Sequence, residues 1–102
     1  LYGAFLATYP GGPLSVEAQF RRGEALAAQG DAQAAARSFL DAFSGAPSGP
    51  YAAPALAALG ETLNTLGQVE EACKTFTEVG IRYPQSPEAA RSAERRAALR
   101  CP

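Results

Sequence analysis

Apolar residues recur at helical spacing along most of the chain, in segments separated by glycine and proline. Ala35, Phe39 and Phe43 stand four residues apart, as one apolar face of an α-helix requires. Almost no segment shows the alternation of apolar and polar residues that is typical of a strand. The pattern predicts an all-α fold with helices over residues 14–29, 32–44, 53–66, 69–83 and 88–100, and it predicts that residues 1–8 end an earlier helix.

The helical pattern repeats with a step of 37 residues, which pairs Gly23 with Gly60, Gly30 with Gly67, Ala35 with Ala72, and Phe39 with Phe76. Such a step is typical of solenoids, whose helix pairs stack because one pair cannot bury its apolar face alone. We expect the small residues to lie where the helices of a pair cross, and the phenylalanines to fill the space between successive pairs. Ser86 before Pro87 predicts the start of the last helix.

The spacing of these residues resembles the signature of the tetratricopeptide repeat, which places a proline after the glycine, the small residue and the aromatic residue. The two copies are Gly23, Ala35, Phe39 and Pro47, then Gly60, Ala72, Phe76 and Pro84. This resemblance implies a tetratricopeptide-repeat α-solenoid with two full helix hairpins and flanking half-repeats. The single domain, residues 1–102, then divides into the end of a preceding repeat (1–10), two repeats (14–47 and 51–84) and a C-terminal capping helix (87–101).

A narrower resemblance is carried by Tyr9-Pro10, by the run from Leu66 to Cys73, and by Tyr83-Pro84-Gln85-Ser86. These segments look like the C-terminal domain of the CpoB (YbgF) family, the periplasmic cell-division coordinators of the Tol-Pal system in Gram-negative bacteria. The resemblance implies a cell-envelope protein of the periplasm that binds TolA, influences a bifunctional penicillin-binding protein, and coordinates peptidoglycan synthesis with outer-membrane constriction. Members of this family trimerise through an N-terminal coiled coil that this sequence lacks, so we expect the isolated domain to be a monomer. The alternatives are a BamD-like scaffold of outer-membrane protein assembly, another bacterial adaptor, or an oligomer whose groove a second copy fills.

Composition excludes several other functions. The formal net charge of −1 gives no electrostatic reason to expect nucleic acid or an anionic membrane as a partner. No apolar run approaches the about 20 residues that span a bilayer. The chain has no histidine and two cysteines, so we expect no metal site, no cofactor and no catalysis. It begins at Leu1 in the middle of the pattern, which is typical of a piece of a longer protein.

The first helix of each hairpin lines the concave face of such a stack, and its outward residues are the candidates for partner binding. They are Phe20, Glu24, Ala57, Glu61, Asn64, Arg91 and Glu94. Glu24 and Glu61 share a repeat position and predict an acidic groove that favours a basic partner segment. Each polar candidate could equally be an ordinary solvated residue, and Phe20 is either an exposed anchor for the partner or a core residue.

Cys73 and Cys101 are either two free thiols or a disulfide. Cys73 lies early in one predicted helix and Cys101 at the end of the next, and antiparallel packing brings such ends together. A bridge would fasten the last helix, which otherwise has little but alanine to hold it, with Ala90, Ala93 and Ala97 on one face. It would also be consistent with an oxidising compartment. The basic rows of that helix (Arg91 with Arg95, Arg96 with Arg100) are interpreted as a solvated face.

Overall fold

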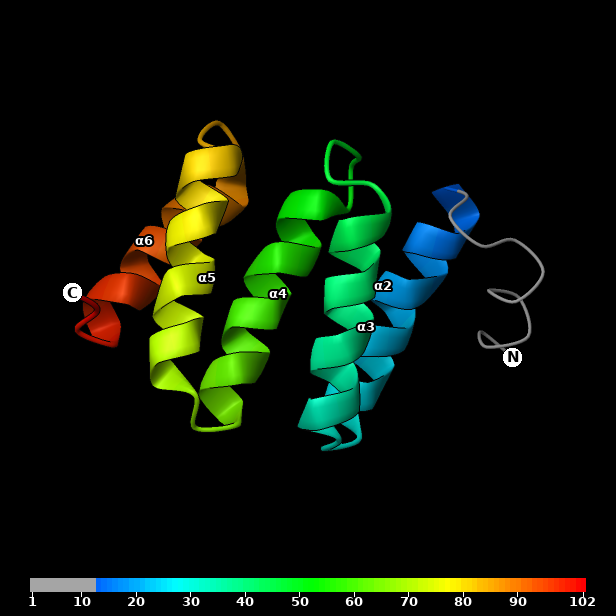
Figure 1. Ribbon diagram of the computed structural model, residues 1–102, viewed down its shortest axis with the longest axis horizontal. Helices are drawn as coiled ribbons and strands as arrows, with labels where there is room; N and C mark the ends of the chain where they lie inside the picture. The colour runs from blue at the N-terminus through cyan, green and yellow to red at the C-terminus, as the bar shows by residue number, and fades with distance from the viewer. Residues whose placement is uncertain (1–12) are drawn as a thin grey trace.

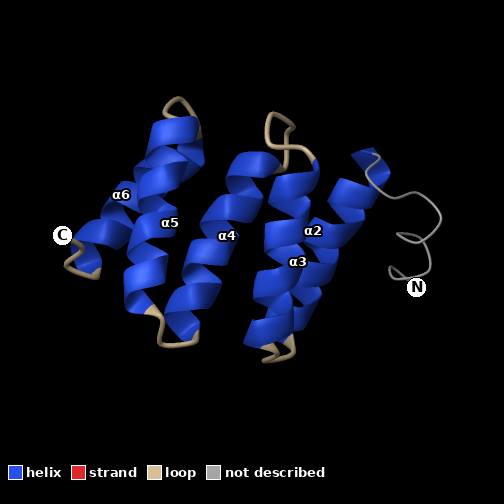
Figure 2. Ribbon diagram, viewed as in Figure 1, coloured by secondary structure: helices blue, strands red, loops and turns tan. Residues whose placement is uncertain are grey.

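The structure, a computed structural model, describes residues 13–102, so the helix end expected over residues 1–8 lies outside the described residues. The described part of the chain forms five helices and no strand, as the apolar spacing predicted (Figure 1, Figure 2). The helices are α2 (Pro13–Ala28), α3 (Ala32–Gly45), α4 (Ala52–Thr65), α5 (Val69–Arg82) and α6 (Pro87–Ala98). None of these helices is long and apolar enough to cross a membrane.

The helices form a stack of antiparallel neighbours. Each packs chiefly on the helices before and after it in the sequence, and α4 also contacts α6. The two tight turns within the hairpins lie at one edge of the stack. The connections over residues 46–51 and 83–86, which we call the first and second proline loops, lie at the opposite edge (Figure 1). The first helices of the hairpins, α2 and α4, therefore run in the same direction as α6, which holds the equivalent place in a third repeat.

Two glycines each lie directly against a phenylalanine ring, and we call each such glycine the seat of its ring. A Cβ atom at Gly23 would lie 2.7 Å from Cδ1 and Cε1 of Phe39, and one at Gly60 would lie 2.7 Å from Cε1 of Phe76. Carbon atoms pack at about 3.5–4.0 Å, so neither position has room for a side chain. Each ring lies against the glycine of its own hairpin, so it packs within a hairpin as well as between successive hairpins. The glycine and the phenylalanine thus act as one unit, which explains why they repeat together.

The turn inside each hairpin has the same backbone geometry. Gly30 and Gly67 adopt left-handed conformations with φ of 85° and 82°, which glycine accommodates without steric cost. In the second turn the Gln68 N–H donates to the Leu63 carbonyl at 2.9 Å, the long hydrogen bond of a Schellman motif.

The end of α6 has the same motif at an earlier place in the repeat. Arg100 adopts φ 57°, and the Cys101 N–H donates to the Arg96 carbonyl at 2.9 Å. In the 37-residue register Arg100 corresponds to Leu63, whereas the left-handed residue of the preceding turn is Gly67. The turn after α6 therefore comes about one helical turn sooner than the turn after α4.

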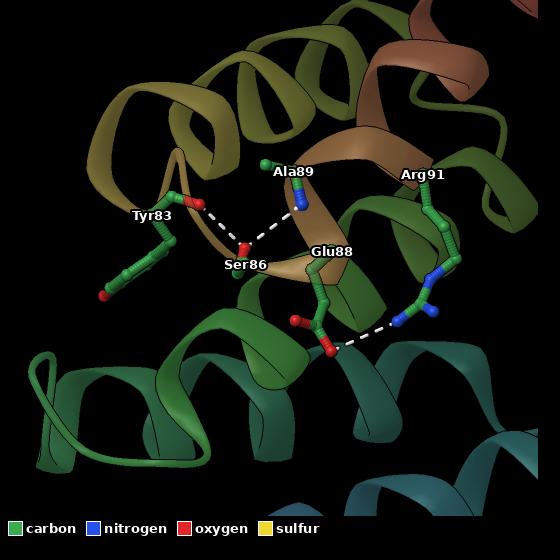
Figure 3. Close-up of polar contacts among 5 residues, drawn as sticks. All are labelled: Tyr83, Ser86, Glu88, Ala89 and Arg91. Atoms are coloured by element: carbon green, nitrogen blue, oxygen red, sulfur yellow. Dashed lines mark hydrogen bonds and ion pairs between the residues drawn. The ribbon is translucent and has the colours of Figure 1, made fainter.

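Side-chain caps fix where two of the helices begin. The Asp31 carboxylate accepts a hydrogen bond from the Ala34 N–H at 3.2 Å at the start of α3. At the start of α6, Ser86 Oγ accepts from the Ala89 N–H at 3.1 Å and donates to the Tyr83 carbonyl at 2.7 Å (Figure 3). The cap predicted at Ser86 is therefore present, with Pro87 at the first helical position.

The two proline loops are tied to each other. The Tyr83 hydroxyl donates a hydrogen bond to the carbonyl of Pro47, so the first residue of the second loop holds the first loop. The ring of Tyr83 also meets that of Phe43 edge to face, with 6.4 Å between their centroids.

The predicted packing face of α6 is wrong. Ala90, Ala93 and Ala97 are all exposed, whereas Ser92 is 1% exposed. The 37-residue register explains the burial of Ser92, which occupies the position of the buried Ala55. It also explains the exposure of Ala97, which occupies the position of Gly60, because only the second helix of a hairpin covers that position. α6 holds the place of a first helix in the repeat, and it packs on α5 and α4 through the face of Ser92.

A disulfide joins the end of α6 to α5. The Sγ atoms of Cys73 and Cys101 are 2.08 Å apart, and their Cα atoms are 5.6 Å apart. Cys73 lies in the second turn of α5 and Cys101 three residues after the last residue of α6, so antiparallel packing has brought the two ends together. Of the two alternatives open to the sequence, the structure contains the bonded pair.

Candidate functional site

A groove of about 460 Å³ lies among α2, α4 and α6, and we call it the first-helix groove. The repeat register builds it, because Pro54 and Ala57 of α4 occupy the positions of Arg91 and Glu94 of α6 and face the same side. Its apolar lining residues are Phe20, Pro54, Ala57, Ala58 and Phe76, and its polar lining residues are Glu61, Glu88, Arg91, Ser92, Glu94 and Arg95. The residues of α6 form one entire wall of this groove.

The structure brings together most of the residues that the sequence placed on the concave face. Phe20, Ala57, Glu61, Arg91 and Glu94 all line the first-helix groove. Two candidates do not. Glu24 is exposed on α2 and accepts a hydrogen bond from Arg21 at 2.9 Å, whereas Asn64 is half-buried near the end of α4.

Charges of both signs meet at the rim of the groove. Arg95 Nε donates to Glu61 Oε2 at 2.6 Å, and this ion pair joins α6 to α4. Arg91 Nη2 donates to Glu88 Oε2 at 3.1 Å within α6 (Figure 3). The lining holds three glutamates and two arginines, so the groove is less acidic than Glu24 and Glu61 predicted, and Glu94 has no ion-pair partner among the described residues. A partner would meet paired charges, and its selection would depend on where they lie more than on their net sign.

Phe20 is a core residue whose ring also reaches the groove. It is 8% exposed, and its centroid lies 5.7 Å from that of Phe39 and 5.5 Å from that of Tyr51. The guanidinium carbon of Arg21 lies 5.5 Å from the centroid of the same ring. Phe20 therefore does not present an exposed anchor to a partner; it supports the apolar lining from below.

Several lining residues were not predicted, and Arg95 and Ser92 of α6 are two of them. Arg95 was interpreted as part of a solvated basic row, yet its side chain crosses to Glu61. Ser92 was not considered, although its register positions are Ala55 and Ala18, which are both buried. The register carried that signal for Ser92, whereas no pattern in the sequence distinguishes Arg95 from the exposed Arg91 and Arg100.

A second groove, which we call the second-helix groove, lies between α3 and α5 over α4. Leu56, Leu59 and Leu63 of α4 line it, and so does Leu40 of α3, which is 48% exposed. Its polar lining residues include Arg37, Asp41, Glu71, Lys74 and Glu78. None of the predicted partner-binding residues lies there, and the mixed charges select no class of ligand.

The titratable groups whose pKa is shifted lie outside the first-helix groove. Residues 13–102 hold no group of three or more histidine, cysteine or acidic side chains that could bind a metal ion. Hydrogen bonds to Glu24 and Glu78 raise the pKa of Arg21 and Arg82, which stay charged in any case. Burial raises the pKa of the Tyr83 phenol, which lies in the proline loop away from the groove. The first-helix groove thus offers an apolar surface bordered by ion pairs.

Comparison with known protein families matches residues 55–86 to the tetratricopeptide repeat. No curated protein matches the chain. The matched segment covers most of α4, all of α5 and the loop before α6, and the first hairpin repeats its glycine–phenylalanine seat and its turn. The described part of the chain therefore has an all-α fold of stacked helix hairpins, in which residues 55–86 match the tetratricopeptide repeat.

Proposed function

We propose that this domain is a non-catalytic protein–protein interaction scaffold that receives a segment of its partner in the first-helix groove. Tetratricopeptide repeats generally bind protein partners, and the match to that repeat supports this class of function. The observation that carries the proposal is the composition of the groove, in which apolar residues of α4 lie beside paired charges from α4 and α6. Such a surface can bury an apolar side chain of a partner while the rim orients its polar groups.

We propose further that the partner is TolA and that the domain works in the periplasm as part of the Tol-Pal system, with a bifunctional penicillin-binding protein as a second partner. The support is the resemblance of Tyr9-Pro10, of residues 66–73 and of residues 83–86 to the CpoB family. The disulfide between Cys73 and Cys101 is consistent with that location, because disulfides persist in oxidising compartments such as the periplasm.

Calorimetric titration of the oxidised domain with the periplasmic part of TolA from the same organism tests the proposal. Ala57→Arg inserts a long charged side chain into the apolar part of the groove and should weaken binding by about tenfold or more. Ala93→Arg is the matched control, because Ala93 is exposed on α6 and does not line the groove. Circular dichroism of both variants establishes that each is folded before its affinity is compared.

The possible outcomes test TolA as the partner and the first-helix groove as the binding site independently of each other. Binding that Ala57→Arg weakens and Ala93→Arg leaves unchanged supports both. Equal affinities for the two variants would remove the groove as the binding site, and no binding at high micromolar concentration would remove TolA as the partner. Sedimentation velocity of the isolated domain distinguishes both results from a groove that a second copy fills.

A further inference from the structure

One wall of the first-helix groove depends on a helix with little apolar packing of its own. α6 supplies Glu88, Arg91, Ser92, Glu94 and Arg95 to the groove. Its only buried residue is Ser92, whereas α4 buries Ala52, Ala53, Ala55, Leu56, Leu59, Gly60 and Thr62. Because apolar burial is the main term that holds a helix in place, α6 is far less firmly attached than α4.

Polar atoms beneath α6 weaken its attachment further. Ser92 Oγ and Arg96 Nε are both buried and have no hydrogen-bond partner among the described residues. Burying a polar atom without a partner costs free energy that an exposed, hydrated atom does not lose. Docking of α6 therefore carries a penalty, and the ion pair of Arg95 with Glu61 is too exposed, at 37% and 48%, to offset much of it.

The covalent bond holds the end of α6, where the noncovalent contacts are weak. The start of α6 is tied to α5 by the short proline loop and by the cap of Ser86. The other end is tied by the disulfide of Cys101 to Cys73, which is itself 7% exposed and thus firmly part of α5. With both ends held, α6 stays on α4 and α5. With the disulfide open, the part of α6 beyond its first turn keeps only the packing of Ser92 and the exposed ion pair of Arg95 with Glu61.

The disulfide lies beside a surface pocket of about 360 Å³. Cys73, Lys74, Leu99 and Arg100 are among the residues that line this pocket. A dithiol attacks one Sγ as a thiolate, the Cys73–Cys101 bond breaks, and the released cysteine thiolate takes a proton. The second thiol of the reductant then displaces the other cysteine, so the protein gains two thiols and the reductant becomes a cyclic disulfide.

We propose that the Cys73–Cys101 disulfide is a redox latch that keeps α6 docked and thereby keeps the first-helix groove formed. The oxidised domain has the complete groove, and reduction by a dithiol releases α6 and removes one wall. The consequence for partner binding rests on the proposed function of the groove, whereas the release of α6 does not. The latch would make a scaffold of this kind competent only under oxidising conditions.

Hydrogen exchange followed by mass spectrometry tests the latch without a partner. Dithiothreitol should speed amide exchange in residues 87–98 by about tenfold or more, because a released helix opens at almost no cost in free energy. Peptides from residues 32–65 serve as the internal reference and should exchange at an unchanged rate. The Cys73→Ser/Cys101→Ser double variant should show fast exchange from the start and no response to the reductant. Unchanged protection of residues 87–98 in reduced protein would overturn the proposal.

Titration of Cys101→Ser with the periplasmic part of TolA, in the absence of reductant, then tests the consequence. Binding should be weaker than that of the oxidised protein by about tenfold or more if α6 forms part of the site. Fast exchange of α6 combined with undiminished TolA binding would uphold the latch and refute the first-helix groove as the TolA site. Absence of TolA binding to either protein would refute that partner and leave the exchange result to decide the latch alone.

Discussion

Replacing Gly60 by alanine puts a methyl group where the ring of Phe76 already lies. The new Cβ would be 2.7 Å from Cε1, 2.9 Å from Cδ1 and 3.0 Å from Cζ of that ring. Phe76 is 1% exposed, so the ring is enclosed by its neighbours and the overlap has to be relieved by a shift of packed groups. Gly80→Ala is the matched control, because Gly80 also lies within a helix and its Cβ would meet nothing within 4 Å.

The two substitutions share one favourable contribution and differ in one unfavourable contribution. Alanine improves helix propensity over glycine by about 0.5–1 kcal/mol at either position. Overpacking a buried site costs about 1–3 kcal/mol, and only Gly60→Ala incurs that cost. The difference between the variants in free energy of unfolding should therefore be about 2 kcal/mol, which corresponds to about 10 °C in Tm for a domain of this size.

Urea denaturation of the oxidised protein, followed by circular dichroism, measures this difference. Gly80→Ala should be at least as stable as the parent, whereas Gly60→Ala should be less stable. Combining Gly60→Ala with Phe76→Leu removes part of the ring, so the alanine should cost less in that background than in the parent. Equal stability of Gly60→Ala and Gly80→Ala would refute the idea that the glycine is needed as a seat for the ring.

Three further outcomes follow from the turns, the loop and the disulfide. Gly67→Ala forces a side chain into a left-handed conformation at φ 82° and should cost about 1–2 kcal/mol in urea denaturation; a neutral effect would contradict that geometry. Burial raises the pKa of Tyr83, so the protonated phenol is favoured by folding and stability should fall as pH rises above about 10; melts of Tyr83→Phe should lack this alkaline loss. Opening the Cys73–Cys101 disulfide should lower the free energy of unfolding by about 3–4 kcal/mol, and identical melting with and without dithiothreitol would argue against it.

The regular part of the fold could be predicted because each signal in the sequence has a local cause. Gly30 and Gly67 mark turns through their left-handed backbone, and Ser86 with Pro87 marks a helix start. The 37-residue step added long-range information, since it paired Gly60 with Gly23 before any packing was known. These features determine the helices, their order and the stacking of the hairpins.

The packing of α6 and the charges of the groove could not be predicted in the same way. Alanine is a weak marker of burial, so Ala90, Ala93 and Ala97 looked like a packing face although the second helix that would cover them is not among those described. The contact of Arg95 with Glu61 joins residues that are 34 apart, and its partner depends on how α6 lies across α4. Such contacts follow from tertiary geometry, which helical periodicity does not contain.

The sequential packing of the helices also determines the order of events as the domain matures. Most contacts join elements that are neighbours in sequence, and helical domains with such local contacts fold in about microseconds to milliseconds. Disulfide formation takes about seconds to hours, so the hairpins are complete while Cys73 and Cys101 are still thiols. The oxidant therefore meets a newly made chain that is almost fully folded, in which α6 docks on α4 and α5 and undocks again. Oxidation captures the docked arrangement and does not guide the search for it.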